Sequence, residues 1–224
     1  MNADDATFCA NCGANLRETS ESVAPLTGAQ TGGGMGAKMS GAFNEGLALI
    51  RDPIGYMTKN KGNSVPLNSL MINYVAMLAL IPLVGRIIGD AIFYHGGELG
   101  YAIAGSIVAY ILDLISVFVV GIVIWKLAPT FSTATDQSKS TLMAAYVYTP
   151  IFFIGILNII PVLGYLAILG LLYGIYILYK GLPILVGTPK DKTVGYVVAV
   201  LVVSFIIVFI IGLIIGGFDA AVHM

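Results

Sequence analysis

Residues 141–180 read TLMAAYVYTPIFFIGILNIIPVLGYLAILGLLYGIYILYK, and this stretch decides the fold class. It is strongly apolar, and Pro161 and Gly164 lie near its centre. A single helix of about 40 residues would be too long for a bilayer, which about 20 residues cross. Because Pro161 and Gly164 do not continue a regular helix comfortably, we expect two spans joined by a tight turn.

The composition of the whole chain is typical of a membrane protein. Of its 224 residues, 58% are hydrophobic and 10% are charged, against about 25% charged residues in soluble domains. We expect an all-α, polytopic membrane protein in which residues 63–224 form a bundle of five transmembrane helices. The expected spans are approximately 67–89, 101–127, 141–160, 162–180 and 194–217. The net charge of −1 indicates no basic surface for nucleic acid.

Positive charges predict how the chain crosses the membrane. With these spans, ten of the eleven Lys and Arg residues fall on the side of the N-terminus, and Arg86 falls on the other. Since loops rich in Lys and Arg remain in the cytoplasm, we expect a cytoplasmic N-terminus and an outside C-terminus.

Two segments precede the first span. Residues 17–41 are rich in Gly, Ser, Thr and Ala and are expected to be a flexible linker. Residues 42–62 carry apolar side chains at spacings of three and four, which predicts amphipathic juxtamembrane helices. Asp52 suits a helix N-cap and Pro53 suits a first helical position, so two short helices should meet at an elbow. They would lie in the lipid interface, pack on the bundle, or do both.

The first 16 residues contain FCANCG, which is typical of one knuckle of a zinc ribbon. A structural zinc needs four ligands, and Cys9 and Cys12 are the only two cysteines of the sequence. Three alternatives follow: a degenerate knuckle that binds nothing, a zinc shared between two chains, or a zinc site completed by a partner.

Polar residues inside apolar spans are candidate functional residues, because burying them in lipid is costly. Asp113 lies near the middle of the second span, and Asn73 and Asn158 are possible hydrogen-bond partners. Its carboxyl group would fix helix packing or serve the passage of a solute or proton. Arg86 and Asp90, four residues apart, are expected to form a local ion pair at the membrane interface.

Three pairs of glycines are spaced four residues apart, which places each pair on one helical face. Such faces let helix backbones approach closely, either within the bundle or in a homodimer. The pairs are Gly85 and Gly89, Gly170 and Gly174, and Gly212 and Gly216.

Two stretches resemble the Ypt-interacting-protein (Yip) family of multi-span membrane proteins: LIRDPIGYM at residues 49–57, and the region from residue 144 to residue 196. The residues that carry the resemblance are Asp52, Pro53, Tyr146, Pro150, Pro161, Gly164, Tyr173, Gly174, Tyr176, Gly181 and Pro183. The resemblance covers about residues 46–217 and implies five spans in a prokaryotic plasma membrane. Prokaryotic members often carry an N-terminal CxxCG ribbon. Eukaryotic relatives bind small GTPases of the Rab type and act in vesicle traffic.

The sequence contains no HExxH, no P-loop and no Ser/His/Asp set, so we expect a protein that is not an enzyme. Three hypotheses remain for its function. The first is a scaffold or adaptor that organises lipid or a cytosolic protein in membrane organisation or trafficking. The second is a small channel or transporter that uses Asp113. The third is a membrane regulator that responds to metal at the N-terminal knuckle.

Overall fold

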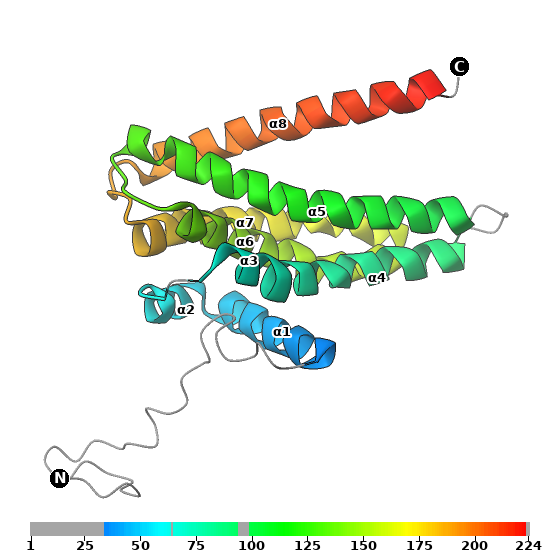
Figure 1. Cartoon of the computed structure of the whole chain (residues 1–224), viewed down its shortest axis with the longest axis horizontal. Helices are drawn as coiled ribbons and strands as arrows, with labels where there is room; N and C mark the ends of the chain where they lie inside the picture. The colour runs from blue at the N-terminus through cyan, green and yellow to red at the C-terminus, as the bar shows by residue number, and fades with distance from the viewer. Residues whose placement is uncertain (1–33, 64, 94–98, 223–224) are drawn as a thin grey trace, which may run out of the picture.

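A computed structural model describes residues 34–63, 65–93 and 99–222, and all regular structure in these residues is helical (Figure 1). The side chains of the last helix are described as far as Ile207. Cys9 and Cys12, with the rest of the expected knuckle, lie outside the described residues. The all-helical part of the sequence prediction is therefore confirmed for the described part of the chain.

The main helices are α1 (Met35–Arg51), α2 (Pro53–Asn60), α3 (Leu67–Leu70), α4 (Ala76–Phe93), α5 (Leu99–Leu127), α6 (Gln137–Ile154), α7 (Ala167–Gly181) and α8 (Thr193–Val222). Short 3-10 or π segments extend them: η2 (Met71–Val75), η3 (Ala128–Phe131), η4 (Gly155–Ile159), η5 (Pro161–Leu166) and η6 (Leu182–Val186). The helices α4 to α8 run side by side in alternating directions, and α8 diverges from α5 toward its C-terminal end (Figure 1).

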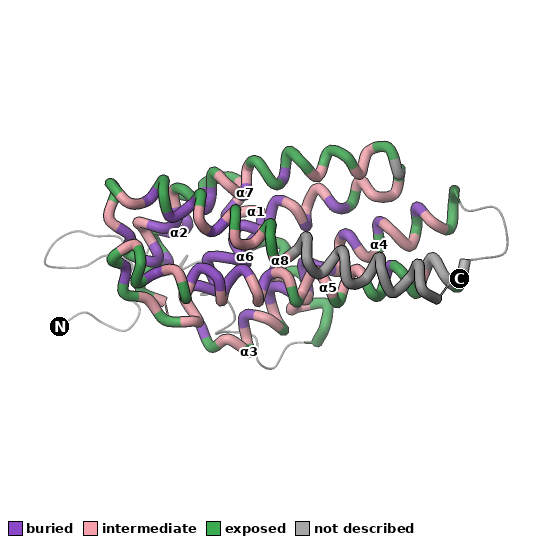
Figure 2. The backbone as a smooth tube through the Cα atoms, turned by 90° about the horizontal axis from the view of Figure 1, so that it is seen from above, coloured by how far each residue is buried: buried purple, intermediate pink, exposed green. Residues whose placement is uncertain are grey.

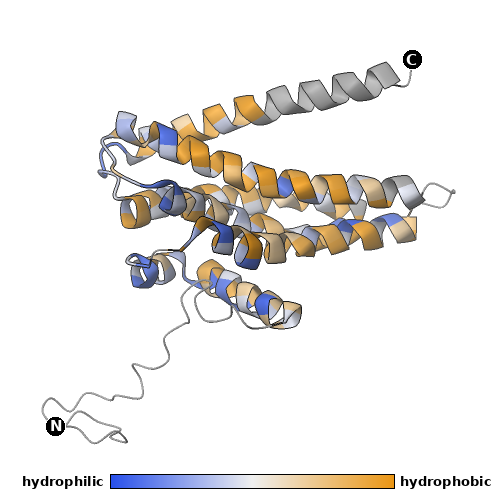
Figure 3. Cartoon of the chain, in the orientation of Figure 1, coloured by the Kyte–Doolittle hydropathy of each residue, from blue (hydrophilic) through white to orange (hydrophobic). Residues whose placement is uncertain are grey.

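Four apolar helical runs among the described residues are long enough to cross a bilayer. They are Leu67–Phe93, Ile103–Phe131, Gln137–Ile159 and Val162–Val186. In α8, the apolar run with described side chains, Thr193–Ile207, is shorter than a span. The structure therefore supports four spans in its described part, and the fifth stays a prediction. Apolar residues dominate the long helices, whereas α1 and α2 alternate between apolar and polar residues (Figure 3).

The chain reverses direction between α6 and α7 (Figure 1). Helix α6 ends at Ile154, and two 3-10 turns meet at Ile160, which has an extended backbone with φ −110° and ψ 110°. Pro161 starts the second turn. Since the residue before a proline is biased away from the helical region, Ile160 is where the helical path breaks.

Helices α1 and α2 meet at Asp52. Its carboxylate accepts a hydrogen bond of 2.9 Å from the Gly55 backbone N–H, and Pro53 takes the first helical position. Helix α1 begins at Met35, inside the segment 17–41 for which we expected a flexible linker. Its buried residues, Ala42, Gly46 and Leu49, lie C-terminal to that segment, and residues 35–41 are half-buried or exposed.

Helix α1 lies alongside the bundle rather than beyond its end (Figure 1). A side-chain carbon added at Gly46 would lie 2.7 Å from the Phe153 ring and 3.2 Å from Thr149. Phe153 is about 24 Å along α6 from Gln137, at 1.5 Å per residue. Helix α1 therefore packs beside the apolar part of α6, and α2 lies at the end of the bundle where α6 begins.

Helix α6 forms the centre of the bundle (Figure 2). It packs against α4, α5, α7 and α1, and its residues from Ser140 to Val147 are all buried. Two neighbours approach its backbone through glycine. A side-chain carbon at Gly121 of α5 would lie 2.7 Å from the Thr141 Cα, and one at Gly174 of α7 would lie 2.5 Å from the Val147 carbonyl oxygen.

Candidate functional site

The elbow between α1 and α2 faces α7 across an open groove of about 570 Å³. We call this groove the elbow pocket. It is lined by Arg51, Asp52, Pro53, Ile54, Tyr173 and Tyr176. Four of these six are residues that carry the family resemblance, and the tertiary structure brings them together from positions about 120 apart in the sequence.

Tyr173 fixes the elbow to α7. Its hydroxyl donates a 2.8 Å hydrogen bond to the carbonyl oxygen of Ile50, in the last turn of α1. Carbonyls in the last turn of a helix lack partners within that helix, so this bond satisfies one of them. Tyr173 also stacks on Tyr176, with ring centroids 5.7 Å apart and planes 27° apart.

Two cations border this pair of tyrosines. Lys180, one helical turn beyond Tyr176, holds its ammonium group 6.0 Å from the Tyr176 ring centroid and 5.4 Å from that of Tyr179. Arg51 is exposed, and its side chain makes no ion pair or hydrogen bond with another described residue. The one carboxylate of the pocket, Asp52, is engaged as the N-cap of α2. Arg51 and Asp52 in the lining balance in charge, and Lys180 at the border adds the net positive charge.

A cluster of tyrosines lies beneath α1, at the contact between α1, α2, η2 and α6. Tyr146 packs edge-on against Tyr56, with ring centroids 5.9 Å apart, and against Tyr74, at 6.2 Å. The hydroxyls of Tyr74 and Thr149 are 2.8 Å apart and hydrogen-bonded. Within the described residues, the buried hydroxyls of Tyr56 and Tyr146 have no hydrogen-bond partner.

Glu45 of α1 completes this tyrosine cluster. Burial raises the pKa of its carboxyl group to about 8, since a charged carboxylate is disfavoured away from water. Burial, and then the nearby Glu45 carboxylate, also raise the pKa of Tyr56 well above its usual value. Glu45 and Tyr56 were not singled out from the sequence, because neither lies within an apolar span. The helical spacing of α1 was the signal that could have placed Glu45 on the packed face.

The sequence prediction for Arg86 needs correction. Its guanidinium does not pair with Asp90 but crosses to α5, where both terminal nitrogens donate to the Asp113 carboxylate at 3.1 and 3.2 Å. Asp90 instead accepts a 3.2 Å hydrogen bond from the Ser106 hydroxyl. The antiparallel packing of α4 on α5 brings these pairs into register, and spacing within one helix cannot reveal such contacts.

Asn73 and Asn158 do not form hydrogen bonds with Asp113 in the described structure. The Asn73 amide donates to the Ser69 hydroxyl at 3.0 Å, one turn earlier in the same span. Asn158 lies in η4, where its side-chain oxygen would be 3.0 Å from a carbon added at Gly164. The Asn73 amide therefore bonds within its own span, and the Asn158 side chain makes no hydrogen bond within the described residues.

Two of the three glycine pairs are used inside the chain. Carbons added at Gly85 and Gly89 of α4 would lie 2.8 and 2.5 Å from backbone carbonyl oxygens of η4. Carbons added at Gly170 and Gly174 of α7 would meet the backbone of α6 at 3.0 and 2.5 Å. These faces are thus occupied by neighbouring helices. Gly212 and Gly216 lie in α8, beyond its described side chains.

Three further residues that carry the family resemblance, Pro150, Pro183 and Gly181, lie in α6, η6 and α7. Pro150 lies inside α6, and Pro183 is the second residue of η6. A carbon added at Gly181 would lie 2.5 Å from the Met143 side chain and 2.9 Å from that of Met57, so glycine here lets α2, α6 and α7 meet.

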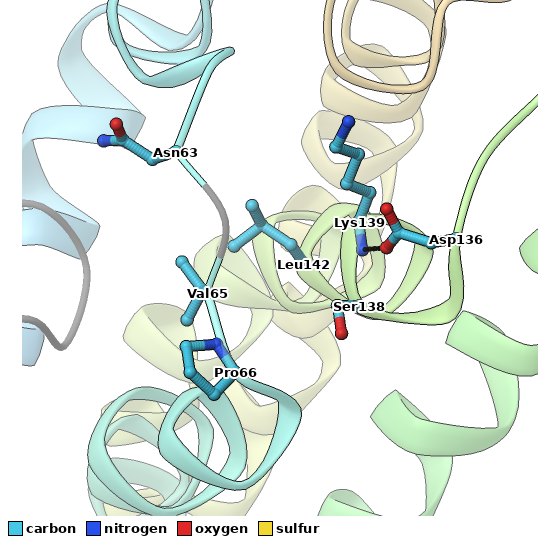
Figure 4. Close-up of a pocket in the computed structure, with 7 residues that line it drawn as sticks. All are labelled: Asn63, Val65, Pro66, Asp136, Ser138, Lys139 and Leu142. Atoms are coloured by element: carbon cyan, nitrogen blue, oxygen red, sulfur yellow. Dashed lines mark hydrogen bonds between the residues drawn. The ribbon is translucent and has the colours of Figure 1, made fainter.

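A second cavity, of about 270 Å³, lies where the loop after α2 faces the start of α6 (Figure 4). Its lining residues are Asn63, Val65, Pro66, Asp136, Ser138, Lys139 and Leu142. Asp136 accepts a 2.8 Å hydrogen bond from the Lys139 backbone N–H, as the N-cap of α6. Asp136 therefore lines the cavity and caps α6 at the same time.

The part of the chain that the structure describes contains no group of three or more His, Cys, Asp or Glu side chains that could hold a metal ion. The described residues therefore offer no alternative to the cysteine knuckle as a zinc site.

Comparison with known proteins identifies relatives of the chain. Residues 47–212 match the model of the Yip1 domain family. Two proteins named Inner membrane protein YohC, from Escherichia coli K12 and from Escherichia coli O6:H1 strain CFT073, are each 26% identical over 148 residues. The similarity covers 60% of this chain and 75% of each relative. No solved structure matches the chain.

Proposed function

The chain belongs to the Yip1 domain family, and on that basis we propose that it is a non-enzymatic membrane adaptor. In this proposal the bundle anchors the protein in a prokaryotic plasma membrane, and the α1–α2 elbow presents a binding surface to lipid or to a cytosolic protein. Its integral membrane character agrees with its apolar helices and with the inner membrane relatives it resembles. The biological setting would be membrane organisation or trafficking.

One observation carries the proposal: the elbow pocket is open and contains Arg51, which has no ion-pair partner among the described residues, whereas Arg86 and Asp113 inside the spans pair with each other. Tyr173 fastens the elbow to α7 at 2.8 Å, which holds the pocket in one shape. Arg86 and Asp113 neutralise each other. Since preorganised surfaces bind with less loss of entropy, the elbow is better suited to recognition than the spans are to moving ions.

The adaptor is tested by photo-crosslinking of the full chain in its native membrane. A photoreactive residue at Ile54, in the elbow pocket, should give a discrete and reproducible protein or lipid adduct. A matched probe at Val108, an exposed residue of α5, should give only diffuse reaction with bulk lipid. The same diffuse pattern from both positions would contradict the proposal.

The adaptor requires the elbow to face the cytosol, and we propose five spans with a cytoplasmic N-terminus. Helix α8 has 30 residues, which makes about 45 Å of helix and is enough to cross a bilayer. In a background with Cys9→Ser and Cys12→Ser, a cysteine at Ala221 should react from outside intact cells and one at Ser138 should not. The reverse pattern would overturn this orientation.

Transport is the second candidate, because the Arg86–Asp113 pair lies inside two spans and each side chain keeps more than a quarter of its surface exposed. In purified proteoliposomes, a transporter would show ion or solute flux that Asp113→Asn abolishes. The adaptor proposal expects equal, background flux from the wild type and from this variant.

The N-terminal knuckle provides the third candidate, a regulator that responds to metal. Cys9 and Cys12 supply two thiolates, which bind zinc weakly beside a full structural site of about 10–16 kcal/mol. Two chains in a homodimer would supply four. One zinc per two chains in the purified protein, lost in Cys9→Ser together with the dimer, would support this role, and an absence of zinc would oppose it.

A further inference from the structure

We propose that the elbow pocket binds the phosphate headgroup of an anionic phospholipid, with Arg51 and Lys180 as its counter-ions and the Tyr173–Tyr176 pair as its wall. This inference deepens the proposed adaptor and rests on it, because it assigns a ligand class to the surface that the adaptor presents.

The border of the pocket at Lys180 lies at the level where a bilayer surface is expected, and its walls Tyr176 and Tyr173 lie about 6 and 10 Å deeper along α7. Lys180 is next to the C-terminal end of α7 and lies over the ring of Tyr179. On α5, Lys126 lies 4.4 Å from the ring centroid of Trp125, near the end of that helix. Both helices end at the side of the bundle that carries α2 (Figure 1). Since Trp, Tyr and basic residues gather at the membrane–water interface, this end of the bundle is at headgroup depth.

The charge of the pocket fits an anion. Arg51 has no ion-pair partner among the described residues. Lys180 contacts aromatic faces, which hold an ammonium group without neutralising its charge. The opposing carboxylate, Asp52, accepts the Gly55 N–H at 2.9 Å and lies at the positive end of the α2 dipole. Arg51 and Asp52 line the pocket and Lys180 borders it beside Tyr176, so two cations stand against one carboxylate and a net positive charge remains.

The face of α7 below the pocket fits an acyl chain. Leu169 and Leu172 share a helical face with Tyr176, at spacings of three and four residues. Leu169 is 53% exposed and Leu172 is 58% exposed. They lie toward the start of α7, so this apolar track leads from the pocket toward the middle of the bilayer. A soluble phosphate compound would contact the two cations but not the exposed leucines of α7, whereas a phospholipid would contact both.

Native mass spectrometry of the full chain in detergent tests this inference. The protein is mixed with phosphatidylglycerol or with phosphatidylcholine of the same acyl chains, and the bound fractions give relative affinities. The wild type should prefer phosphatidylglycerol. Arg51→Ala/Lys180→Ala should weaken phosphatidylglycerol binding about 25-fold, since about 1 kcal/mol per basic residue corresponds to about fivefold for each. Its phosphatidylcholine binding should not change.

The matched control is Lys61→Ala/Lys190→Ala, which removes the same charge from exposed positions at the same end of the bundle. It should bind phosphatidylglycerol as the wild type does, and the melting temperatures of both double variants should confirm that they fold. Equal losses in the two double variants, or no loss in the pocket variant, would overturn the proposal. Displacement of the lipid by glycerol phosphate would do so too, because the ligand would then be a soluble phosphate.

Failure of this inference and failure of the adaptor are distinguishable. Mass spectrometry uses purified protein and reports lipid alone, whereas crosslinking from Ile54 in the native membrane also reports protein partners. A discrete protein adduct at Ile54 with no preference for phosphatidylglycerol would leave the adaptor standing and refute the lipid site.

Discussion

Helices α5 and α6 are neighbours in the bundle, yet the more apolar helix is the more exposed. In the span of α6, 56% of residues are buried inside the protein, against 28% in the more apolar span of α5. The buried residues of α6 include Ser140, Thr141 and Thr149. The exposed residues of α5 include Ile107 and Ile111.

This contrast follows from the solvent. Lipid tails are as apolar as leucine, so apolar side chains gain nothing by leaving lipid for the protein interior. Small residues do gain, because they permit close backbone packing, and a buried hydroxyl gains where it finds a partner, as Thr149 does with Tyr74 at 2.8 Å. In this bundle, hydropathy predicts which helices span, and small or polar residues predict which faces pack.

The largest effect on folding should come from replacing a glycine of α5 that packs closely on α6. A second glycine of α5, which has no neighbour among the described residues, provides the comparison. A carbon added at Gly121 would lie 2.6 Å from the Thr141 hydroxyl oxygen, whereas one added at Gly105 would meet nothing within 4 Å. Gly121→Leu should force α5 from α6 and prevent folding, while Gly105→Leu should fold normally. Thermal unfolding in detergent and yield of monodisperse protein measure both. If the two variants give the same melting temperature and the same yield, the distinction between packed and lipid-facing surfaces of α5 is wrong.

The next largest effect concerns charges at the α4–α5 contact. Asp113→Asn leaves Arg86 without its partner inside the bundle. We expect a loss of about 2–3 kcal/mol in the free energy of unfolding, below the roughly 3–5 kcal/mol of fully buried pairs because both side chains are partly exposed.

Two variants sharpen this prediction. Replacing both charges, as in Arg86→Met/Asp113→Leu, should restore most of the stability, because apolar residues of similar volume pack well at such positions. Asp90→Asn should change little, since an amide oxygen still accepts from the Ser106 hydroxyl. If Asp113→Asn is no worse than Asp90→Asn, the ion pair contributes nothing to stability.

A smaller effect, confined to α1, should follow from pH. The pKa of Glu45 is about 8 in the folded protein against an ordinary 4.5, so its neutral form favours packing of α1. This contribution is complete below about pH 4.5, weakens above it and is lost as the pH passes 8. The titratable groups that face Glu45 are Tyr56, Tyr74 and Tyr146. Hydrogen exchange of α1 amides, corrected for intrinsic rates, should show protection falling over this range, and Glu45→Gln should remove the dependence.

The smallest effect should come from the elbow. Tyr173→Phe removes the hydrogen bond to the Ile50 carbonyl and should cost about 1 kcal/mol, since water can reach the open pocket and replace the donor. Hydrogen exchange should rise in the last turn of α1 and spare the centre of α6. Tyr179→Phe is the control, because it leaves that bond intact. Increased exchange throughout α6 would mean that Tyr173 supports the bundle as a whole.

Much of this architecture was readable from local sequence. Long apolar runs predicted spans, Pro161 marked the reversal between α6 and α7, and Asp52 with Pro53 marked the elbow, because each of these features acts over a few residues. The start of α1 was not readable. Residues 35–41 have little apolar character of their own, and they are half-buried or exposed in the structure.

Hydropathy and turn residues express local free energies, so the sequence alone was enough to predict a helical membrane protein. The tertiary structure was needed to show which side chains contact one another. Arg86 pairs with Asp113 rather than with Asp90. Glu45 of α1 lies near Tyr56, and Arg51 lines one pocket with Tyr173 and Tyr176. Such contacts depend on the rotation and register of each helix against its neighbours. Those are set by close packing at small residues across the whole bundle, which no single segment encodes.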